Sequence, residues 1–326
     1  MRKFRTTAHG AALLALALFV GACGSGVGGD DDDGGGGNGD AGGGGGGQPV
    51  ASQLVLGGPP ECPERPFCIP GLMETYGIEF QDFKPLDVAG PLTVRALEGG
   101  EIDVALLFST QSVIADRGWV LLEDDQGLQT AENITPVLNH SVHDATVEGL
   151  LNQISGALTT ENVTELNGRV EIDGDKPGDV AADFLESEGI SGEGESGSGN
   201  ITVGAVAFAE NQIVAEMYAQ VLEQAGYSVK RQLDLGSREI LQPALESGEI
   251  HVAPEYLGSL LLFLDPEAEA SGDPAGNAEL LTPLLDQKGV AFLEYSEAND
   301  TNAFVVTQET ADEYGLQSVS DLAAEM

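Results

Sequence analysis

The chain contains one short phrase twice. Residues 96–105 are "ALEGGEIDVA" and residues 244–253 are "ALESGEIHVA". The copies differ at two positions only: Gly99 against Ser247, and Asp103 against His251. Each copy predicts a helix that ends in a Gly-Glu turn and leads into a strand. Any α/β protein can reuse a good helix-to-strand connection, but such reuse does not explain the near-identity. The phrase therefore predicts two α/β lobes of similar build.

The rest of the chain shows the same pattern. The β-branched run "ITVGAVAF" (201–208) predicts a strand, and residues 209–226 carry apolar side chains at helical spacing up to Gly226. "YSVKRQLDL" (227–235) alternates as a strand. The Thr residues of "LTTENVTELN" (158–167) suit a helix N-cap. Strands that alternate with helices favour a mostly parallel sheet covered on both faces. His251, near the start of an expected strand, is interpreted as structural.

The first residues predict export. Arg2, Lys3 and Arg5 precede the apolar run "AALLALALF", which is too short for a membrane-spanning helix and is typical of a secretory signal. The segment "VGAC" resembles the bacterial lipobox, so Cys23 is expected to carry the lipid anchor. The alternative is an ordinary signal peptide with a chance cysteine.

Two composition breaks divide the chain after Cys23. Residues 24–48 are almost only Gly and Asp, and residues 191–200 read "SGEGESGSGN". Neither stretch can bury enough apolar surface to fold. The expected parts are a signal segment (1–23), a disordered tether (24–50), a first half (51–193), a flexible connector (194–200) and a second half (201–326).

The chain is strongly acidic. Asp and Glu outnumber Lys and Arg 54 to 13, which gives a formal net charge of −41. This charge argues against nucleic acid as a partner and against direct adsorption to anionic lipid. Because the acidity is spread along the whole chain, it predicts a solvated surface and says little about a ligand.

Cys62 and Cys68 lie close together in "PPECPERPFCIPG". In an oxidising compartment such a pair is expected to form a disulfide. A metal site is the alternative, but no histidine lies nearby and two thiolates do not complete a tetrahedral site. No metal and no cofactor are therefore predicted.

Longer segments resemble a known family. "ITVGAVAFAENQIVAEMYAQVLEQAGY", "LGSREILQPALESGEIHVAPEYLGSLL" and "NDTNAFVVTQETADEYGLQSVSDLA" are similar to the N-terminal half of the substrate-binding proteins of ABC importers for glycine betaine, choline and related osmoprotectants. "LVLGGPPECPERPFCIPGLMETYGIEF", "GPLTVRALEGGEIDVALLFST" and "VLLEDDQGLQTAENITPVLN" are similar to the C-terminal half. The order of the halves is reversed, which suggests a circular permutation. The alternative is a rearranged or misassembled gene without a folded product.

The resemblance implies a two-lobe, type II periplasmic-binding-protein (Venus-flytrap) fold with two crossing strands. Lobe one is expected to contain residues 201–300 and 126–193, and lobe two residues 51–122 and 301–326. The crossings are expected near "NDTNAFVVT" and "LLEDDQ".

The resemblance also implies a function. The protein is expected to be a monomer on the extracytoplasmic face of a bacterial membrane, attached only through its lipid, where it delivers a quaternary amine to an ABC transporter permease. The alternative is a binding or sensory lipoprotein of the same fold for another small amine or an amino-acid-like ligand. Enzyme activity is not expected. His140 and His143 in "NHSVHD" are the only hint of a catalytic or metal site, and no GxSxG, HExxH or phosphate-loop motif accompanies them.

Aromatic residues are the first candidates for the ligand site, because a quaternary ammonium is recognised by aromatic faces. By resemblance, Tyr256 in "PEYLG" is a cage tyrosine, with a packing role as the alternative. Phe208 follows the first strand of the second half and is expected at the mouth of the cleft, or else in the lobe core. Phe108 in "LLFST" stands where relatives often have a tyrosine.

Polar candidates complete the expected site. Ser109 and Thr110 are expected to donate to a ligand carboxylate, or else to cap the next helix. Arg65 in "PERPFC" matches an arginine that meets the ligand carboxylate in some relatives, with a surface ion pair as the alternative. Asp300 and Asn302 stand where relatives place polar or aromatic cage residues. Because a tyrosine near Asn302 is missing, a full tyrosine cage is in doubt and a less methylated amine becomes an option.

Overall fold

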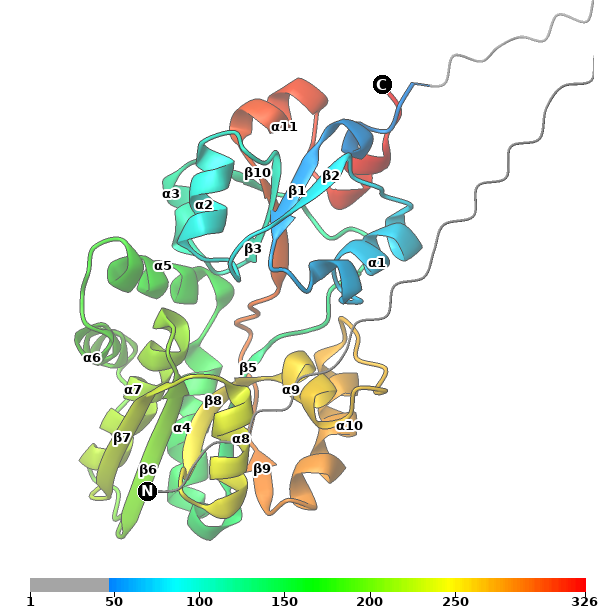
Figure 1. Cartoon of the computed structure of the whole chain (residues 1–326). Coiled ribbons are helices and arrows are strands. Elements are labelled where there is room, and N and C mark those ends of the chain that lie inside the picture. The colour runs from blue at the N-terminus through cyan, green and yellow to red at the C-terminus, as the bar shows by residue number, and fades with distance from the viewer. Residues whose placement is uncertain (1–46) are drawn as a thin grey trace, which may run out of the picture. The chain divides into compact units, whose positions relative to one another are not determined.

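The computed structural model describes residues 47–326 (Figure 1). The expected signal segment, the expected lipid-carrying Cys23 and most of the expected tether lie outside the described residues. Within residues 47–326, no helix is both long enough and apolar enough to cross a membrane.

Two five-stranded sheets form the framework, one in each lobe (Figure 1). In lobe one the strand order is β7-β6-β8-β5-β9, and in lobe two it is β2-β1-β3-β10-β4. The strands of lobe one are β5 (Ile134–Asn139), β6 (Asn200–Val206), β7 (Ser228–Leu235), β8 (Val252–Tyr256) and β9 (Val290–Phe292). Those of lobe two are β1 (Val55–Gly58), β2 (Asp82–Pro85), β3 (Val104–Phe108), β4 (Val120–Leu121) and β10 (Asn302–Val306).

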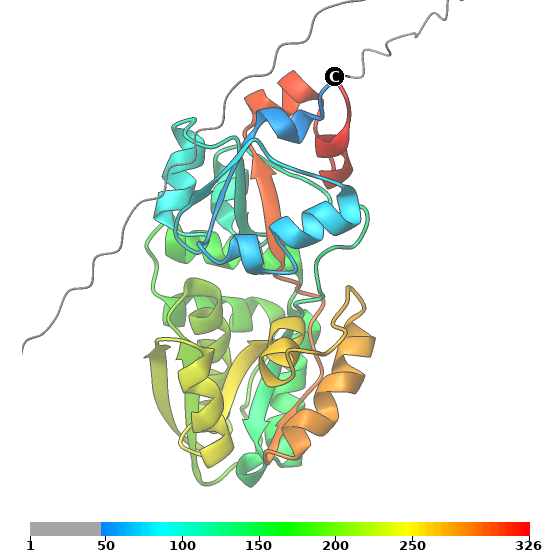
Figure 2. The same ribbon diagram turned by 45° about the vertical axis from the view of Figure 1, so that its right-hand side comes forward.

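Each sheet is mixed in the same way. Three strands run parallel, β7-β6-β8 in lobe one and β2-β1-β3 in lobe two. The fourth strand is antiparallel to both its neighbours: β5 pairs Ile134 with Tyr256 of β8, and β10 pairs Asn302 with Phe108 of β3. Both antiparallel strands follow a segment in which the chain passes from one lobe to the other, residues 122–133 before β5 and residues 293–301 before β10. Figure 2 shows both segments between the lobes. The result is the two-lobe type II fold that the resemblance implied.

Helices cover both faces of each sheet. In lobe one, one face packs against α4–α7 and the other against α8–α10. In lobe two, α2 and α3 cover one face, and α1, α11 and short helical turns cover the other. The longer helices are α2 (Pro91–Glu98), α4 (Ala145–Ala157), α5 (Thr160–Glu171), α6 (Pro177–Glu188), α7 (Ala209–Gln224), α8 (Arg238–Ser247), α9 (Leu257–Leu264) and α10 (Pro274–Asp286). The shorter ones are α1 (Ile69–Gly71), α3 (Ser112–Asp116), α11 (Gln308–Tyr314) and the turns Val50–Gln53, Cys62–Glu64, Leu72–Tyr76, His140–Val142 and Val319–Ala323.

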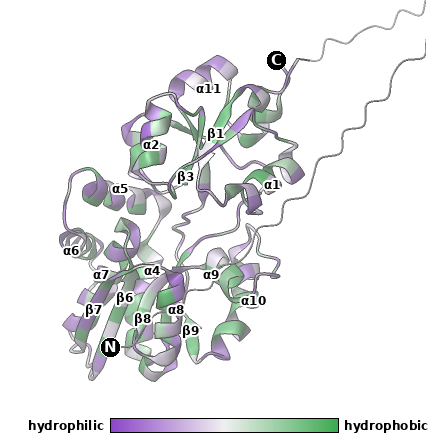
Figure 3. Cartoon of the chain, viewed as in Figure 1, coloured by the Kyte–Doolittle hydropathy of each residue, from purple (hydrophilic) through white to green (hydrophobic). Residues whose placement is uncertain are grey.

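Sequence and structure agree on these elements. The predicted helix at 209–226 is confirmed as α7, and Gly226 follows it with a φ of +101°. The predicted N-cap is confirmed at Thr159, whose side chain accepts a hydrogen bond from the backbone N–H of Asn162. Figure 3 shows hydrophobic colour on the central strands β3 and β6, whereas hydrophilic and hydrophobic colours alternate along β7 and the helices.

The repeated phrase forms the same corner in both lobes. The first copy joins α2 to β3 and the second joins α8 to β8. In each corner one glycine, Gly100 or Gly248, has a left-handed backbone, with φ of +66° and +75°. Asp103 and His251, which differ between the copies, also make equivalent hydrogen bonds. Asp103 Oδ2 accepts from the backbone N–H of Val55 at 2.8 Å, and His251 Nδ1 accepts from that of Thr202 at 3.0 Å.

A disulfide joins Cys62 and Cys68, whose Cα atoms are 5.3 Å apart. Both cysteines are buried in the hydrophobic core of lobe two, on the face of β1 and β3 that α1 and α11 cover. The disulfide therefore closes the loop that follows β1 against that core.

Candidate functional site

A cavity of about 1040 Å³ lies between the two lobes. Lobe two contributes residues of α2, the loop after β3, and α3, whereas lobe one contributes residues of α5, the loop after β6, and the ends of β8 and α8. Its aromatic and polar lining includes Phe108, Thr110, Asn167, Glu171, Phe208, Glu210, Arg238, Tyr256, Ser259 and Asp300. Several of these stand at the carboxyl ends of parallel strands, where ligand sites of α/β proteins commonly form.

Two aromatic rings form one wall of the cavity. Phe208 is the residue before α7, and Tyr256 ends β8. Their ring centroids are 6.1 Å apart with an angle of 27° between the planes, so the rings are stacked. Phe208 is 40% exposed, whereas Tyr256 is buried and donates its hydroxyl to Glu210 Oε1 at 2.7 Å. Phe108, at the end of β3, lines the cavity from lobe two.

Glu210 is at the centre of the polar side chains that line the cavity. It lies in the first turn of α7, where the helix dipole favours a negative charge, and only 3% of it is exposed. Besides the bond from Tyr256, its Oε2 accepts from Thr110 Oγ1 at 2.7 Å and from Asn167 Nδ2 at 3.1 Å. Burial raises the pKa of Glu210 above its ordinary value, although these three hydrogen bonds oppose the shift. Because Thr110 belongs to lobe two, this carboxyl group links the lobes.

Asp300 is in the crossing segment before β10. Its Oδ1 lies 2.8 Å from Thr110 Oγ1 and accepts from the backbone N–H of Thr110 at 3.2 Å. Burial, followed by the repulsion of Glu210, raises the pKa of Asp300 well above its ordinary value. Two carboxyl groups from different elements thus meet at one hydroxyl group.

Arg238, Glu255 and Glu132 form a second group of charged side chains near Glu210 and Asp300. Arg238 binds Glu255 through Nε at 3.0 Å and through Nη2 at 2.7 Å. Glu132, in the other crossing segment, accepts from the backbone N–H of Ser259 at 3.0 Å and from its hydroxyl at 2.7 Å. Burial raises the pKa of Glu132 to about 7. The Arg238 charge is thus matched by Glu255, and the polar part of the cavity stays rich in acceptors.

The structure brings five of the eight sequence candidates to the cavity: Phe108, Thr110, Phe208, Tyr256 and Asp300. Ser109 and Asn302 lie outside the lining. Ser109 donates to the carbonyl of Asn299 at 3.2 Å and accepts from the N–H of Thr301 at 2.9 Å, while Asn302 donates to Gln129 Oε1 at 3.0 Å. Ser109 therefore stabilises the crossing segment before β10, and Asn302 forms a hydrogen bond to the other crossing segment.

Arg65 also lies outside the lining, 4.0 Å from Glu61 in a partly exposed pair. The capping alternative for Ser109 and Thr110 is not observed, because the residue before α3 is Gln111 and no side chain caps that helix. The binding roles of all eight candidates stay predictions.

Sequence reasoning missed Glu210, Asn167, Arg238, Ser259 and Glu132. For Glu210 a signal was present, since an acidic residue in the first turn of a helix that follows a strand is well placed for a strand-end site. Asn167 and Glu132 could not be found this way. Asn167 lines the cavity only because α5 packs beside α7. Glu132 lies near the cavity only because the two crossing segments run side by side.

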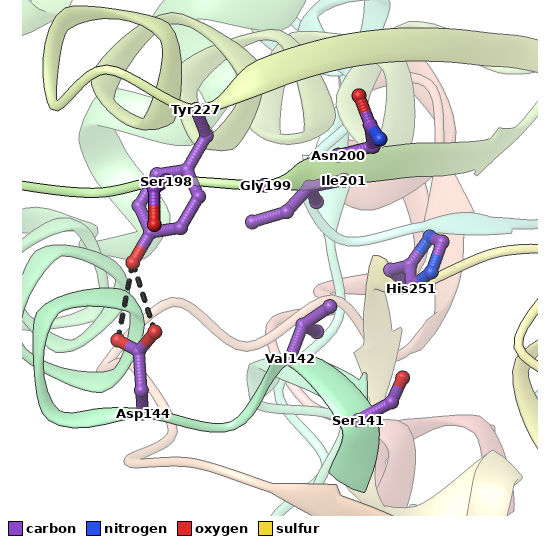
Figure 4. A pocket seen from close by; sticks show the side chains of 9 residues that line it. All are labelled: Ser141, Val142, Asp144, Ser198, Gly199, Asn200, Ile201, Tyr227 and His251. Atoms are coloured by element: carbon purple, nitrogen blue, oxygen red, sulfur yellow. Dashed lines mark hydrogen bonds between the residues drawn. The ribbon is translucent and has the colours of Figure 1, made fainter.

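A second cavity of about 280 Å³ lies at the other end of lobe one, where Tyr227 donates to Asp144 (Figure 4). His251 lines it, and its hydrogen bond with Thr202 agrees with the structural role expected from the sequence. The exposed His140 and His143 lie near Asp286 and Glu148, at 3.7 and 3.2 Å. Within residues 47–326, no group of three or more His, Cys, Asp and Glu side chains gathers as metal ligands would.

Two lobes, two crossing segments and a polar, aromatic cavity between them define a two-lobe ligand-binding protein. A family model, described as the substrate binding domain of ABC-type glycine betaine transport system, matches residues 47–187 and 199–326. The chain belongs to this family.

Curated relatives are similar over one part of the chain. A glycine-betaine-binding protein of Pseudomonas aeruginosa is 31% identical over 43% of this chain and 44% of its own length. The carnitine transport binding protein OpuCC of Listeria monocytogenes is 32% identical over 43% and 46%. The glycine betaine-binding protein YehZ of Escherichia coli is 28% identical over 38% and 41%. Each similarity thus spans less than half of the relative.

Among solved structures, the second substrate binding domain of a putative amino acid ABC transporter from Streptococcus pneumoniae is similar with a TM-score of 0.41 and 11% identity. That similarity covers 83% of this chain and 90% of the other.

Proposed function

We propose that the protein is an extracytoplasmic substrate-binding protein that captures a quaternary amine in the interlobe cavity and delivers it to an ABC importer. Membership of the family supports this function. So do the names of the similar proteins, which bind glycine betaine or take part in carnitine transport. The protein acts as a monomer and catalyses no reaction.

The observation that carries the proposal is the stacked pair of Phe208 and Tyr256 beside Glu210 and Asp300. A quaternary ammonium offers no N–H group, so its diffuse charge is best met by aromatic faces and nearby negative groups. In a desolvated site one such cation–π contact contributes about 2 kcal/mol, which is more than a factor of ten in affinity. The cavity is large enough for this class of ligand, because small-molecule sites are commonly about 300–1,000 Å³.

Isothermal titration calorimetry with glycine betaine, choline and carnitine tests this function. We expect binding of at least one of them, and we expect Tyr256→Ala to weaken it at least tenfold. Tyr256→Phe keeps the ring but loses the bond to Glu210, so it is expected to retain most of the affinity. Tyr314→Ala, outside the cavity lining, is the matched control. Flat titrations for every quaternary amine would exclude this ligand class.

We further propose that Cys23 carries a lipid that anchors the protein to the membrane. Its place after "VGA", following a basic and an apolar segment, supports this role. Cys23→Ser is expected to release the protein from the membrane fraction into the soluble fraction. Retention of the variant with the membranes would contradict lipid attachment at this residue.

Finally, we propose that the chain is a circular permutant of its family. The family model matches in two separate pieces, and each sheet combines strands from both halves of the chain. The backbone at residues 48–50 lies against that at 324–326: the N–H of Val50 donates to the carbonyl of Ala324 at 3.0 Å, and that of Met326 to Gln48 at 3.2 Å. A peptide link between these two segments would therefore require little rearrangement.

A further inference from the structure

The Thr110 hydroxyl lies between two carboxyl groups. Its Oγ1 is 2.7 Å from Glu210 Oε2 and 2.8 Å from Asp300 Oδ1, so both contacts have hydrogen-bond length. A hydroxyl group has one proton and can donate it to only one acceptor at a time. The second contact is favourable only if the other carboxyl group carries a proton and donates it to Thr110. The arrangement is therefore balanced when Glu210 and Asp300 share one proton.

The surroundings favour the shared proton. Burial is the main reason why the pKa values of Glu210 and Asp300 are raised. The other titratable groups that interact with the pair are Glu132, Glu171 and Tyr256, and Arg238, which is paired with Glu255, lines the same cavity. The positive charge of Arg238 is already matched by Glu255, and Glu132 and Glu171 add further carboxyl groups. The pair is thus short of positive charge.

Asn167 independently indicates that a hydrogen-bond donor of a ligand binds beside Glu210 and Asp300. Its Nδ2 donates to the carbonyl of Thr110 at 3.2 Å and to Glu210 Oε2 at 3.1 Å, which fixes the orientation of the amide. Its Oδ1 is buried and has no hydrogen-bond partner among residues 47–326, although Asn167 is only 3% exposed and lines the cavity. A buried acceptor without a donor is costly, so a ligand that supplies one would gain affinity.

We propose that Glu210, Asp300 and Asn167 form a subsite that receives the hydrogen-bond donor of a cationic amine, and that the nearby positive charge of this ligand replaces the proton shared through Thr110. The carboxyl O–H bond breaks, its proton passes to the buffer, and the carboxylate pairs with the cation. This subsite depends on the proposed function, capture of an amine, and narrows its ligand class to amines that carry an O–H or N–H group.

Three small amines separate the possibilities. Choline has a quaternary nitrogen and a hydroxyl donor, dimethylethanolamine has both an N–H and an O–H donor, and glycine betaine has no donor at all. Isothermal titration calorimetry of the purified full-length protein at pH 7 should give at least tenfold tighter binding of choline and dimethylethanolamine than of glycine betaine. Choline does not titrate, so any proton released on its binding comes from the protein.

The proton is counted by repeating the choline titration in phosphate and in imidazole, two buffers with different ionisation enthalpies. The observed heats should differ by the amount expected for release of about one proton per choline bound. Asp300→Asn should abolish this difference, whereas Glu313→Gln, an exposed control in α11, should leave it unchanged. Thr110→Ser keeps the hydroxyl and should also preserve the release.

The outcomes are distinguishable. Equal choline heats in both buffers, or glycine betaine binding as tightly as choline, would overturn the subsite while leaving amine capture intact. Failure of all three amines, and of carnitine, to bind would overturn the subsite together with the proposed function. The wild-type proton count depends on no variant, so a misfolded variant cannot mask the result.

Discussion

At the level of single residues, Asp103 and His251 show how one position can be filled by different chemistry. Each residue makes two hydrogen bonds to one residue of the neighbouring strand, Asp103 to Val55 and His251 to Thr202. In each pair the side chain accepts from the partner's backbone N–H, and the backbone N–H donates to the partner's carbonyl. An aspartate accepts in its charged form, but a histidine accepts through Nδ1 only while that nitrogen is unprotonated. The hydrogen bond at the corner of lobe one is therefore expected to be lost when His251 is protonated at Nδ1.

His251 gives a pH-dependent prediction. Burial lowers its pKa, so the unfolded chain binds its proton more readily than the folded one. Its contribution to stability is complete above the unfolded pKa of about 6.5 and is lost as the pH falls below that value. In His251→Asp the acceptor persists, so the free energy of unfolding should fall less between pH 7 and pH 5.5 than in the wild type. Urea unfolding at both pH values measures this difference, and equal decreases would contradict it.

The aromatic residues of the site could be predicted from the sequence, but its polar centre could not. Phe208 and Tyr256 each stand at the end of an expected strand, and ligand sites of α/β proteins commonly form at strand ends. The role of Asn167 depends on how α5 packs against α7, and the position of Arg65 outside the cavity depends on how the disulfide loop is held against lobe two. Both are set by tertiary packing, which local sequence patterns do not record.

At the level of elements, the helix-to-strand corner is the unit from which both lobes are built. Its glycines, Gly100 and Gly248, have left-handed φ values that cost an L-residue about 1–2 kcal/mol. The helices and strands of each corner could be predicted because their periodicity is local. The antiparallel strands β5 and β10 could not be predicted from periodicity, because their direction depends on where the crossing segments enter each sheet.

Gly248→Ala tests the corner. A Cβ at this position would find its nearest atom, Asn139 Nδ2, at 3.7 Å, so the cost comes from the backbone and not from a clash. We expect the free energy of unfolding to fall by about 1 kcal/mol. Ser247→Ala, one residue earlier in α8, should change it by less than about 0.5 kcal/mol. An unchanged stability of Gly248→Ala in chemical denaturation would show that the left-handed backbone is not required.

At the level of the whole molecule, the crossing segments join two lobes that each contain strands from both halves of the chain. Contacts with α7 and the residue after it hold the segment 191–200: Ser191 and Gly192 donate to Gln224, and the N–H of Gly197 donates to the carbonyl of Ala225 at 2.8 Å. Both halves of the chain are therefore needed to build each lobe and the cavity between the lobes.

A chain in the usual order tests the permutation. Residues 199–326 followed directly by residues 47–190 should fold, and should bind choline within about threefold of the native order, because domain ends at a surface tolerate relocation. A chain reopened inside α7, between Tyr218 and Ala219, is the control and should not fold. Circular dichroism and calorimetry compare the two. Loss of folding in the first chain would contradict the permutation.

The central claim is that the cavity between the lobes holds an amine against Phe208 and Tyr256. A crystal structure of the protein grown with choline tests it most directly. We expect the quaternary nitrogen within about 6 Å of the Tyr256 ring centroid and the choline hydroxyl donating to the Glu210, Asp300 and Asn167 group. Choline bound elsewhere, or a cavity without choline at saturating concentration, would contradict the claim.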